Sequence, residues 1–205
     1  FANPAAEQIG AAASQMGIAP DDRVILWIGY PVPFKRVHLL IDVLDRVIRQ
    51  EAKARLVLIG VKADRMASLH ETITARGLEN QVTILPPVPH ESLPGYYAAA
   101  HVYALTSSYE GLPRVLFEAG AAGLAAVGFD VPGVNEMITA DTGRIVPDGD
   151  LEGFASAVLD LLRDRDQARM LGDHARTIAL SQYDADGYPD RWAAVWQRAA
   201  QKGLR

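Results

Sequence analysis

Short apolar runs that end at glycine alternate with helix-period segments along most of this chain. The clearest run, Val24-Ile-Leu-Trp-Ile-Gly29, precedes residues 36–51, whose apolar side chains recur at helical spacing. A continuously apolar run is typical of a parallel strand covered on both faces, and the helical spacing predicts an amphipathic helix. Repetition of this strand–helix unit predicts an α/β fold.

The alternation defines the whole predicted topology. The predicted strands are 24–29, 56–60, 82–85, 102–106, 125–129 and 144–146. The predicted helices are 36–51, 64–76, 91–100, 113–122, 151–163, 166–181 and 187–201, with a helical turn at 133–138. Right-handed crossovers then give one Rossmann-like, doubly wound parallel sheet over residues 1–205, with a helical C-terminal tail. Ligands of such a sheet bind beyond the carboxyl ends of the strands.

Composition excludes several classes of protein. A formal net charge of −5, with scattered lysine and arginine, argues against a nucleic-acid partner. The absence of cysteine excludes disulfides, thiolate metal sites and a cysteine nucleophile, and it is compatible with a reducing cytoplasm. The longest apolar run, Ala119 to Phe129, is too short to span a bilayer. No secretory signal opens the sequence, so we expect a cytoplasmic protein.

Two adjacent cations, Lys35 and Arg36, follow the first predicted strand in the segment Gly29-Tyr-Pro-Val-Pro-Phe-Lys-Arg36. Cations at a strand-to-helix turn, beside the positive end of the helix, suit a phosphate group. The alternative is that both are solvated loop cations, and the residues alone do not decide between the two. The loop is neither a P-loop nor a GxGxxG turn, so it gives no support for a dinucleotide.

Two carboxylates flank the start of the helix after the fourth strand. Glu110 precedes it, and Glu118 lies roughly 8 Å along its axis. A helix that starts near Pro113 would leave the amides of Leu112 and Arg114 free, and Gly111 would allow close approach of a ligand. Carboxylates accept hydrogen bonds from sugar hydroxyls. Spacing alone favours the alternative that Glu110 caps the helix and Glu118 pairs with an arginine.

The segment Glu110-Gly-Leu-Pro-Arg-Val-Leu-Phe-Glu118 resembles the Glu-x7-Glu signature of retaining glycosyltransferases with the GT-B fold. This is glycosyltransferase group 1, typified by bacterial mannosyltransferases and glycogen synthases. The other matching motifs, in the family's order, are Gly29 and Lys35, Leu93 and Tyr97, Ala98-Ala-Ala100, Ser107, Tyr109, Glu118-Ala-Gly-Ala-Ala-Gly123, Pro132-Gly133, Glu136, Thr142-Gly143, Val146-Pro147 and Gly149-Asp150. The resemblance runs from about residue 1 to residue 200 and implies the C-terminal, donor-binding lobe of the GT-B fold.

The resemblance also implies roles for the loop residues. Lys35 would hold the diphosphate of a nucleoside diphosphate sugar, Glu118 the ribose hydroxyls and Glu110 the hydroxyls of the transferred hexose. Lys35 and Glu110 are the predicted catalytic residues. The predicted donor-binding residues are Gly29, Tyr30, Lys35, Arg36, Pro87, Val88, Glu110, Gly111, Leu112, Pro113, Arg114 and Glu118. Of these, Pro87 and Val88 belong to the loop expected along the nucleobase. We expect no cofactor and no metal, because Asp-x-Asp recurs three times as a weak pattern.

The family's enzymes have a first lobe that brings most of the acceptor site, and nothing in this chain resembles it. We therefore expect a fragment, or a product whose partner lobe lies elsewhere, that is inactive when isolated. Any peripheral membrane association is expected only through that missing lobe. The tail at about 181–205 should cross to the missing lobe, which would leave Trp192, Val195 and Trp196 partly exposed.

Three positions depart from the family's pattern. Tyr30 stands where an arginine is usual, Arg36 where a glycine is usual, and Pro86 where a glycine is usual in the base-binding loop. Arg36 is expected to compensate for the charge missing at Tyr30. These departures leave open a non-catalytic nucleotide-sugar binding module. A related GT-B epimerase is disfavoured, since an epimerase does not call for the Glu110/Glu118 pair.

Overall fold

The computed structural model describes residues 3–182 and residue 197, and its centre is a six-stranded sheet. The strands are β1 (Arg23–Ile28), β2 (Ala54–Ile59), β3 (Val82–Leu85), β4 (Val102–Leu105), β5 (Ala126–Phe129) and β6 (Gly143–Val146). Their order is β3-β2-β1-β4-β5-β6, and every neighbouring pair is parallel. The predicted doubly wound parallel sheet is confirmed.

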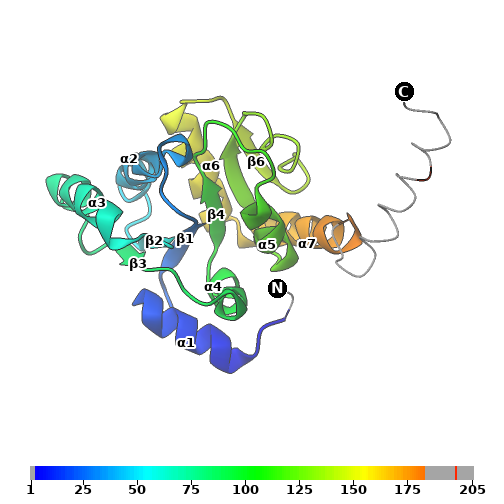
Figure 1. Ribbon diagram of the computed structural model, residues 1–205, viewed down its shortest axis with the longest axis horizontal. Helices are drawn as coiled ribbons and strands as arrows, with labels where there is room; N and C mark the ends of the chain where they lie inside the picture. Colours follow the sequence, from blue (N-terminus) through cyan, green and yellow to red (C-terminus); the bar gives the residue numbers. More distant parts are fainter. Residues whose placement is uncertain (1–2, 183–196, 198–205) are drawn as a thin grey trace.

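Helices cover both faces of the sheet (Figure 1). They are α1 (Ala6–Met16), α2 (His38–Val47), α3 (Ala63–Ala75), α4 (Leu93–Ala98), α5 (Arg114–Ala121), α6 (Leu151–Arg163) and α7 (Arg165–Gln182), with 3-10 turns η1 (Pro33–Lys35) and η2 (His90–Ser92). One face carries α2, α3 and α6, and the other carries α1, α4, α5 and α7. The sheet is therefore enclosed in a three-layer sandwich.

Burial of the central strands explains their unbroken apolar sequences. In β1, the five residues from Val24 to Ile28 are buried, and Trp27 is fully enclosed. On α2, a stripe that includes Leu40, Ile41 and Leu44 is buried against this layer, whereas the intervening charges face outward. The period-based predictions of these elements are correct because one continuous core makes use of both patterns.

The order of the strands reverses between β1 and β4. From β1 the chain moves outward to β2 and β3, and then returns to place β4 on the other side of β1. In doubly wound sheets, ligands bind beyond the carboxyl ends of the strands at such a switch point. Lys35 follows β1 and Glu110 follows β4, which puts both predicted residues at this switch point.

The helix α1 was not predicted from the sequence. Its segment is rich in alanine, and only Ala12 and Met16 are buried, so it has no stripe of large apolar side chains. It packs on α4, where a Cβ added at Gly95 would lie 2.6 Å from the carbonyl oxygen of Gln8. Small residues on both helices permit this close approach, and they are also the reason the periodicity is weak.

Two predicted boundaries require correction. The helix predicted over 36–51 begins at His38, because Arg36 has a φ of +46° and the preceding residues form η1. The segment 133–138 forms the predicted helical turn in part, since the Ile138 amide donates to the Val134 carbonyl four residues back, but no continuous helix forms and Gly133 has a φ of +80°. Both positive φ values interrupt a right-handed helical path.

The C-terminal part of the chain is described as far as α7. This helix matches the predicted helix at 166–181. The predicted helix at 187–201, including Trp192, Val195 and Trp196, lies outside the described residues apart from residue 197. None of the described helices is long and apolar enough to cross a membrane.

Candidate functional site

The side chains of Lys35 and Glu110 meet beyond the carboxyl ends of β1 and β4. Lys35 Nζ lies 2.5 Å from Glu110 Oε1, and the Ser107 hydroxyl donates to the same oxygen at 2.6 Å. The Glu110 side chain is only 8% exposed. A largely buried carboxylate is stable when a charge and a hydrogen bond compensate it, as here. The two predicted catalytic residues therefore form one cluster with Ser107.

Arg36 has different partners from its neighbour Lys35. Its guanidinium donates to the carbonyls of Thr106 and Ser107 and lies 2.5 Å from Asp148 Oδ1. It also lies over the ring of Phe129, 5.1 Å from the ring centroid. Arg36 thus connects the loop after β1 to the end of β4 and to the loop after β6.

Further contacts fasten the same two loops together. The Thr106 hydroxyl donates to the carbonyls of Lys35 and Arg36, and the Ser108 amide donates to the carbonyl of Phe34. Phe34 stacks on Tyr109, with ring centroids 4.9 Å apart. The segments 33–36 and 106–110 form one hydrogen-bonded unit that fixes the backbone on both sides of the Lys35–Glu110 pair.

The start of α5 differs from its predicted form. The helix begins at Arg114, and the Arg114 amide donates to the carbonyl of Leu112 in a tight turn centred on Pro113. The prediction that the Arg114 amide is free is therefore wrong, because the turn uses it. A Cβ added at Gly111 would meet nothing within 4 Å, so there is free space beside this residue.

Gly133 supports the loop that carries Glu110. The Glu110 amide donates to the carbonyl of Pro132, and a Cβ on Gly133 would lie 2.0 Å from the Glu110 carbonyl oxygen. With its φ of +80°, this position accepts only glycine without displacement of the Glu110 backbone. The Pro132-Gly133 motif therefore has a structural reason within the site.

Glu118 lies on α5 and is held by a different element. Its Oε2 accepts a hydrogen bond from the Tyr97 hydroxyl at 2.9 Å, and His90 Nε2 lies 3.6 Å from its Oε1. No side chain caps α5, Glu110 pairs with Lys35, and the contacts of Glu118 are with Tyr97 and His90. The alternative in which Glu110 caps the helix and Glu118 pairs with an arginine is wrong for the described residues.

A pocket of about 290 Å³ lies beyond the carboxyl ends of β1, β2 and β3. Its lining residues are Ile28, Gly29, Tyr30, Ile59, Gly60, Lys62, Pro87, Val88 and Leu93. The structure thus brings four predicted residues, Gly29, Tyr30, Pro87 and Val88, to one cavity. Gly60 has a φ of +97°, and a Cβ there would lie 2.4 Å from the Gly29 carbonyl oxygen, so glycine allows the two loops to approach.

Tyr30 is one wall of this pocket. Its hydroxyl donates to Asp64 at 3.2 Å, and Lys62 Nζ lies 5.4 Å from the centroid of its ring. Sequence reasoning missed Lys62, although it follows the second strand-then-glycine pattern and lies in a loop where ligands of this fold bind. Ser107, Tyr97 and His90 were also missed as partners of the two glutamates.

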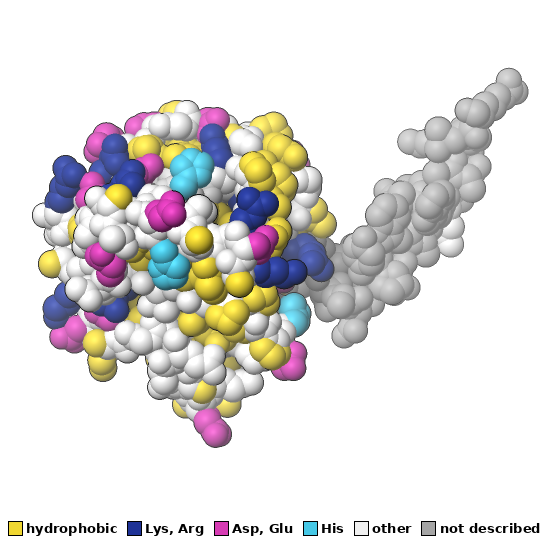
Figure 2. Space-filling view, turned by 60° about the vertical axis from the view of Figure 1, so that its left-hand side comes forward, with side chains coloured by type: hydrophobic (Ala, Val, Ile, Leu, Met, Phe, Trp, Pro, Cys, Tyr) yellow, Lys and Arg dark blue, Asp and Glu magenta, His cyan; other side chains and the backbone are white. Residues whose placement is uncertain are grey.

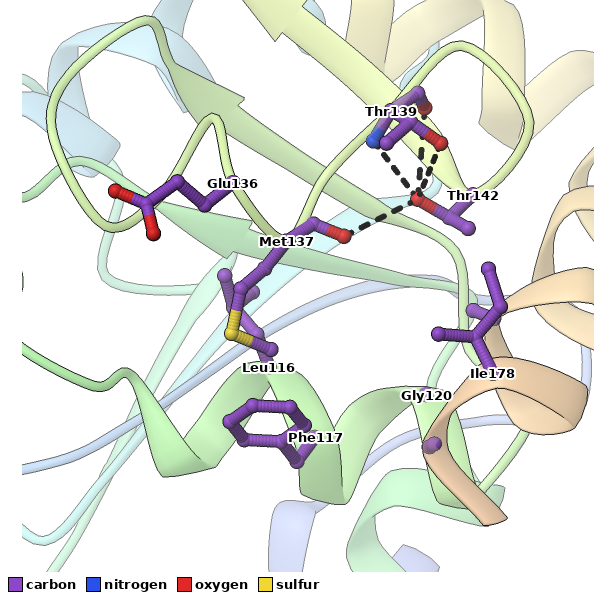
Figure 3. Close-up of a pocket in the computed structure, with 10 residues that line it drawn as sticks. Leu116, Phe117, Gly120, Glu136, Met137, Thr139, Thr142 and Ile178 are labelled. Carbon is purple, nitrogen blue, oxygen red and sulfur yellow. Dashed lines mark hydrogen bonds between the residues drawn. The ribbon is translucent and has the colours of Figure 1, made fainter. Parts of the chain in front are cut away.

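A second pocket, of about 180 Å³, lies between α5, the segment 136–142 and α7 (Figure 3). Its lining is mostly apolar, with Leu116, Phe117, Met137 and Ile178 among the walls. Figure 3 shows the Glu136 carboxylate directed away from the Thr139–Thr142 hydrogen bonds. The lining contains none of the predicted donor-binding residues, so this cavity is separate from the Lys35–Glu110 pair.

Surface charge and metal ligands add little to the site. On the face shown in Figure 2, lysine and arginine side chains lie among aspartate and glutamate side chains, without an extended field of one sign. Within the described part of the chain, no group of three histidine, aspartate or glutamate side chains could hold a metal ion. Asp148 pairs with Arg36, and Asp150 Oδ1 accepts from the Gly153 amide at the start of α6. These contacts account for the first Asp-x-Asp pattern.

The parallel six-stranded sheet with helices on both faces, and with its switch point between β1 and β4, defines a Rossmann-like lobe. The model of the family "Glycosyl transferases group 1" matches residues 10–178. This chain belongs to that family.

Curated relatives agree with this assignment. The chain is 30% identical over 198 residues to a D-inositol 3-phosphate glycosyltransferase of Nocardia farcinica, and the alignment covers 91% of this chain and 44% of the relative. It is 29% identical over 163 residues to a GDP-mannose-dependent alpha-(1-6)-phosphatidylinositol monomannoside mannosyltransferase of Mycobacterium tuberculosis, with 76% of this chain and 42% of the relative covered. The chain thus spans less than half the length of these two relatives.

Solved structures share the fold. HepE of Anabaena, crystallised in complex with UDP and glucose, superposes with a TM-score of 0.85 at 24% identity, over 95% of this chain and 53% of that one. A glycosyltransferase from Rickettsia africae superposes with a TM-score of 0.86 at 15% identity, over 96% of this chain and 52% of the other. Both similarities support the fold of one lobe.

Proposed function

We propose that this chain is the nucleotide-sugar donor-binding lobe of a retaining glycosyltransferase. It would transfer a hexose from a nucleoside diphosphate sugar to an acceptor that a separate N-terminal lobe supplies. The observation that carries the proposal is the meeting of Lys35 and Glu110 at the switch point of the sheet. A cation for a diphosphate and a carboxylate for sugar hydroxyls lie side by side where this fold binds its ligands.

In this proposal, each part of the donor has a place. The base enters the pocket at Gly29, Tyr30, Pro87 and Val88. The ribose hydroxyls donate to Glu118, and the diphosphate lies against Lys35. When the donor binds, the hexose hydroxyls donate to Glu110 and replace Lys35 as its partner.

The chemistry required of this lobe is positioning and electrostatic stabilisation. The bond between the sugar and the diphosphate breaks with its electron pair on the leaving diphosphate, where Lys35 offsets the charge. The acceptor hydroxyl attacks from the face that the diphosphate leaves and passes its proton to the departing diphosphate oxygen, so that the anomeric configuration is retained without a protein nucleophile. Arg36, fixed by Thr106, Ser107 and Asp148, keeps the loop of Lys35 in place.

Calorimetry with UDP, GDP and ADP tests donor binding. We expect one of these nucleotides to bind the unmodified chain, and we expect Lys35→Ala and Glu118→Ala each to weaken it about 10- to 100-fold, because each removes a hydrogen bond to a charged group. Lys53→Ala is the matched control, since it removes the same charge from an exposed pair with Asp21. Equal, negligible binding of all three nucleotides to every variant would contradict the proposal.

A further inference from the structure

Glu118 is fixed from the interior of the lobe by one phenol. The Tyr97 hydroxyl donates to Glu118 Oε2 at 2.9 Å and also lies 3.5 Å from the Val115 carbonyl, one turn earlier on α5. Tyr97 is 1% exposed, whereas the Glu118 side chain is 16% exposed. The contact thus joins a buried group to a carboxylate at the edge of the solvent.

The position of the Tyr97 ring is set by three elements. It lies on α4, which packs on α1 through Gly95. It contacts the ring of Tyr103 on β4, with centroids 5.9 Å apart. Tyr103 is itself held, since its hydroxyl donates to the Ile28 carbonyl at 3.2 Å. The Tyr97 hydroxyl therefore has little freedom to turn away from Glu118.

The direction of the hydrogen bond is fixed by chemistry. An ionised carboxylate only accepts, so the phenol must donate. Burial, and then the neighbouring Tyr103 and Glu118, raise the pKa of Tyr97 well above its usual value, which keeps the hydroxyl protonated. One oxygen of Glu118 is thus oriented toward the interior, and its other oxygen faces the side of His90.

We propose that Tyr97 is a positioning residue that orients Glu118 to accept from the ribose hydroxyls. It would thereby make this lobe select ribonucleotides over 2′-deoxyribonucleotides. The inference rests on the proposed donor-binding function and adds a residue and a specificity to it. A carboxylate held at one oxygen presents acceptors in a fixed direction to two neighbouring hydroxyls, and a deoxyribose leaves one acceptor unmatched.

The test compares affinities for UDP and dUDP, and for GDP and dGDP, in the unmodified chain and in Tyr97→Phe. We expect the unmodified chain to favour the ribonucleotide about 10-fold, the effect of one hydrogen bond to a charged group. In Tyr97→Phe the ribonucleotide should weaken while the deoxyribonucleotide is unchanged, so the ratio falls toward one. Tyr96→Phe, whose hydroxyl contacts Gln15 instead, is the matched control and should keep the full ratio.

The other possible results of this binding test each contradict a different part of the proposal. Equal weakening of both nucleotides in Tyr97→Phe overturns the positioning role, because a purely structural contact does not distinguish the sugars. Nucleotide binding without any ribose preference in the unmodified chain overturns the inference and the place of Glu118 at the ribose, but not the nucleotide-binding role of the lobe. No binding of any of the four nucleotides overturns the proposed function and the inference with it.

A second variant reaches the same interaction from the other side. Glu118→Asp keeps the charge but draws the carboxylate back from Tyr97 by one methylene group. We expect it to lower the ratio of ribonucleotide to deoxyribonucleotide affinity as Tyr97→Phe does. An unchanged ratio in Glu118→Asp contradicts the proposal, even if Tyr97→Phe does not fold.

Discussion

Lys35 and Glu110 are 75 residues apart in the chain, yet their side chains are in direct contact, with Lys35 Nζ 2.5 Å from Glu110 Oε1. The strand pattern placed both residues at the ligand-binding edge, but their roles were predicted only from the resemblance to the family, because spacing alone favoured a capping role for Glu110 and left Lys35 undecided. The patterns did not predict their pairing, since a motif gives the type and spacing of residues but not which charges meet. The same limit applies to Tyr97 and Glu118, which are 21 residues apart.

At the residue scale, His101 should make stability depend on pH. Its Nδ1 accepts from the Val24 amide at 3.1 Å, and burial, followed by the charges of Arg165 and Arg23, lowers its pKa to about 4. The unfolded chain takes up a proton near pH 6.5. The stabilisation from neutral His101 is therefore complete above about pH 6.5 and is lost as the pH falls toward 4.

Thermal unfolding at pH 7 and pH 5 measures this dependence. We expect the unmodified chain to lose about 1 kcal/mol more than His101→Asn between these values, a figure reduced for solvent screening of the partly exposed ring. Asparagine is the matched variant, because its side-chain oxygen can accept from the Val24 amide but does not titrate. Parallel pH profiles for the two proteins would show that His101 is not the group responsible.

At the scale of elements, the long and strongly patterned segments were predictable and the sparsely patterned ones were not. All six strands were predicted, because each combines a short apolar run with a flanking turn. The helix α1 was missed, since its buried side chains, Ala12 and Met16, are too few to make a periodic stripe. The segment 133–138 was predicted as a helical turn, and the hydrogen bond from Ile138 to Val134 agrees with this, although nothing in the sequence indicates that Gly133 adopts a positive φ.

The contact between α1 and α4 should be sensitive to a single methyl group. Gly95→Ala would place a Cβ 2.6 Å from the Gln8 carbonyl oxygen, so the helices must separate. We expect a loss of about 1–3 kcal/mol in urea unfolding, the usual cost of overpacking. Gly10→Ala, on α1 with nothing within 4 Å of its Cβ, should be neutral or stabilising by up to about 1 kcal/mol. Equal stability of Gly95→Ala and the unmodified chain would mean that this close approach is not required.

At the scale of the whole molecule, one core runs through the sheet and both helical layers. This is why a fold class could be predicted from local periodicity, since every buried run belongs to the same sandwich. The depth of the pocket at β1–β3 could not be predicted in the same way, because it depends on how closely Gly60 approaches Gly29. The periodicity of a strand does not report the separation of the loops that follow it.

A single core predicts a single unfolding transition. Phe154 on α6 is fully buried and meets Phe129 on β5 edge to face, with centroids 4.9 Å apart. Phe154→Ala should cost about 3–5 kcal/mol in denaturant unfolding. Far-UV circular dichroism and tryptophan fluorescence should still report the same midpoint. Met170→Ala, exposed on α7, is the control and should change stability by less than about 1 kcal/mol. Separate midpoints for the two signals would contradict a single cooperative unit.

The Lys35–Glu110 pair affects which anions can bind to the unliganded lobe. With Lys35 already paired with Glu110, free orthophosphate does not meet Lys35 as an uncompensated cation. An anion that takes Lys35 away leaves a carboxylate that is only 8% exposed without its counter-ion, unless hydroxyls replace the lost partner. A complete donor replaces both halves of the pair, because it brings a diphosphate for Lys35 and hexose hydroxyls for Glu110, and a nucleoside diphosphate offsets the same cost through its base and ribose contacts. We therefore expect free orthophosphate to bind this site more weakly than a nucleoside diphosphate, and a nucleoside diphosphate more weakly than the complete donor.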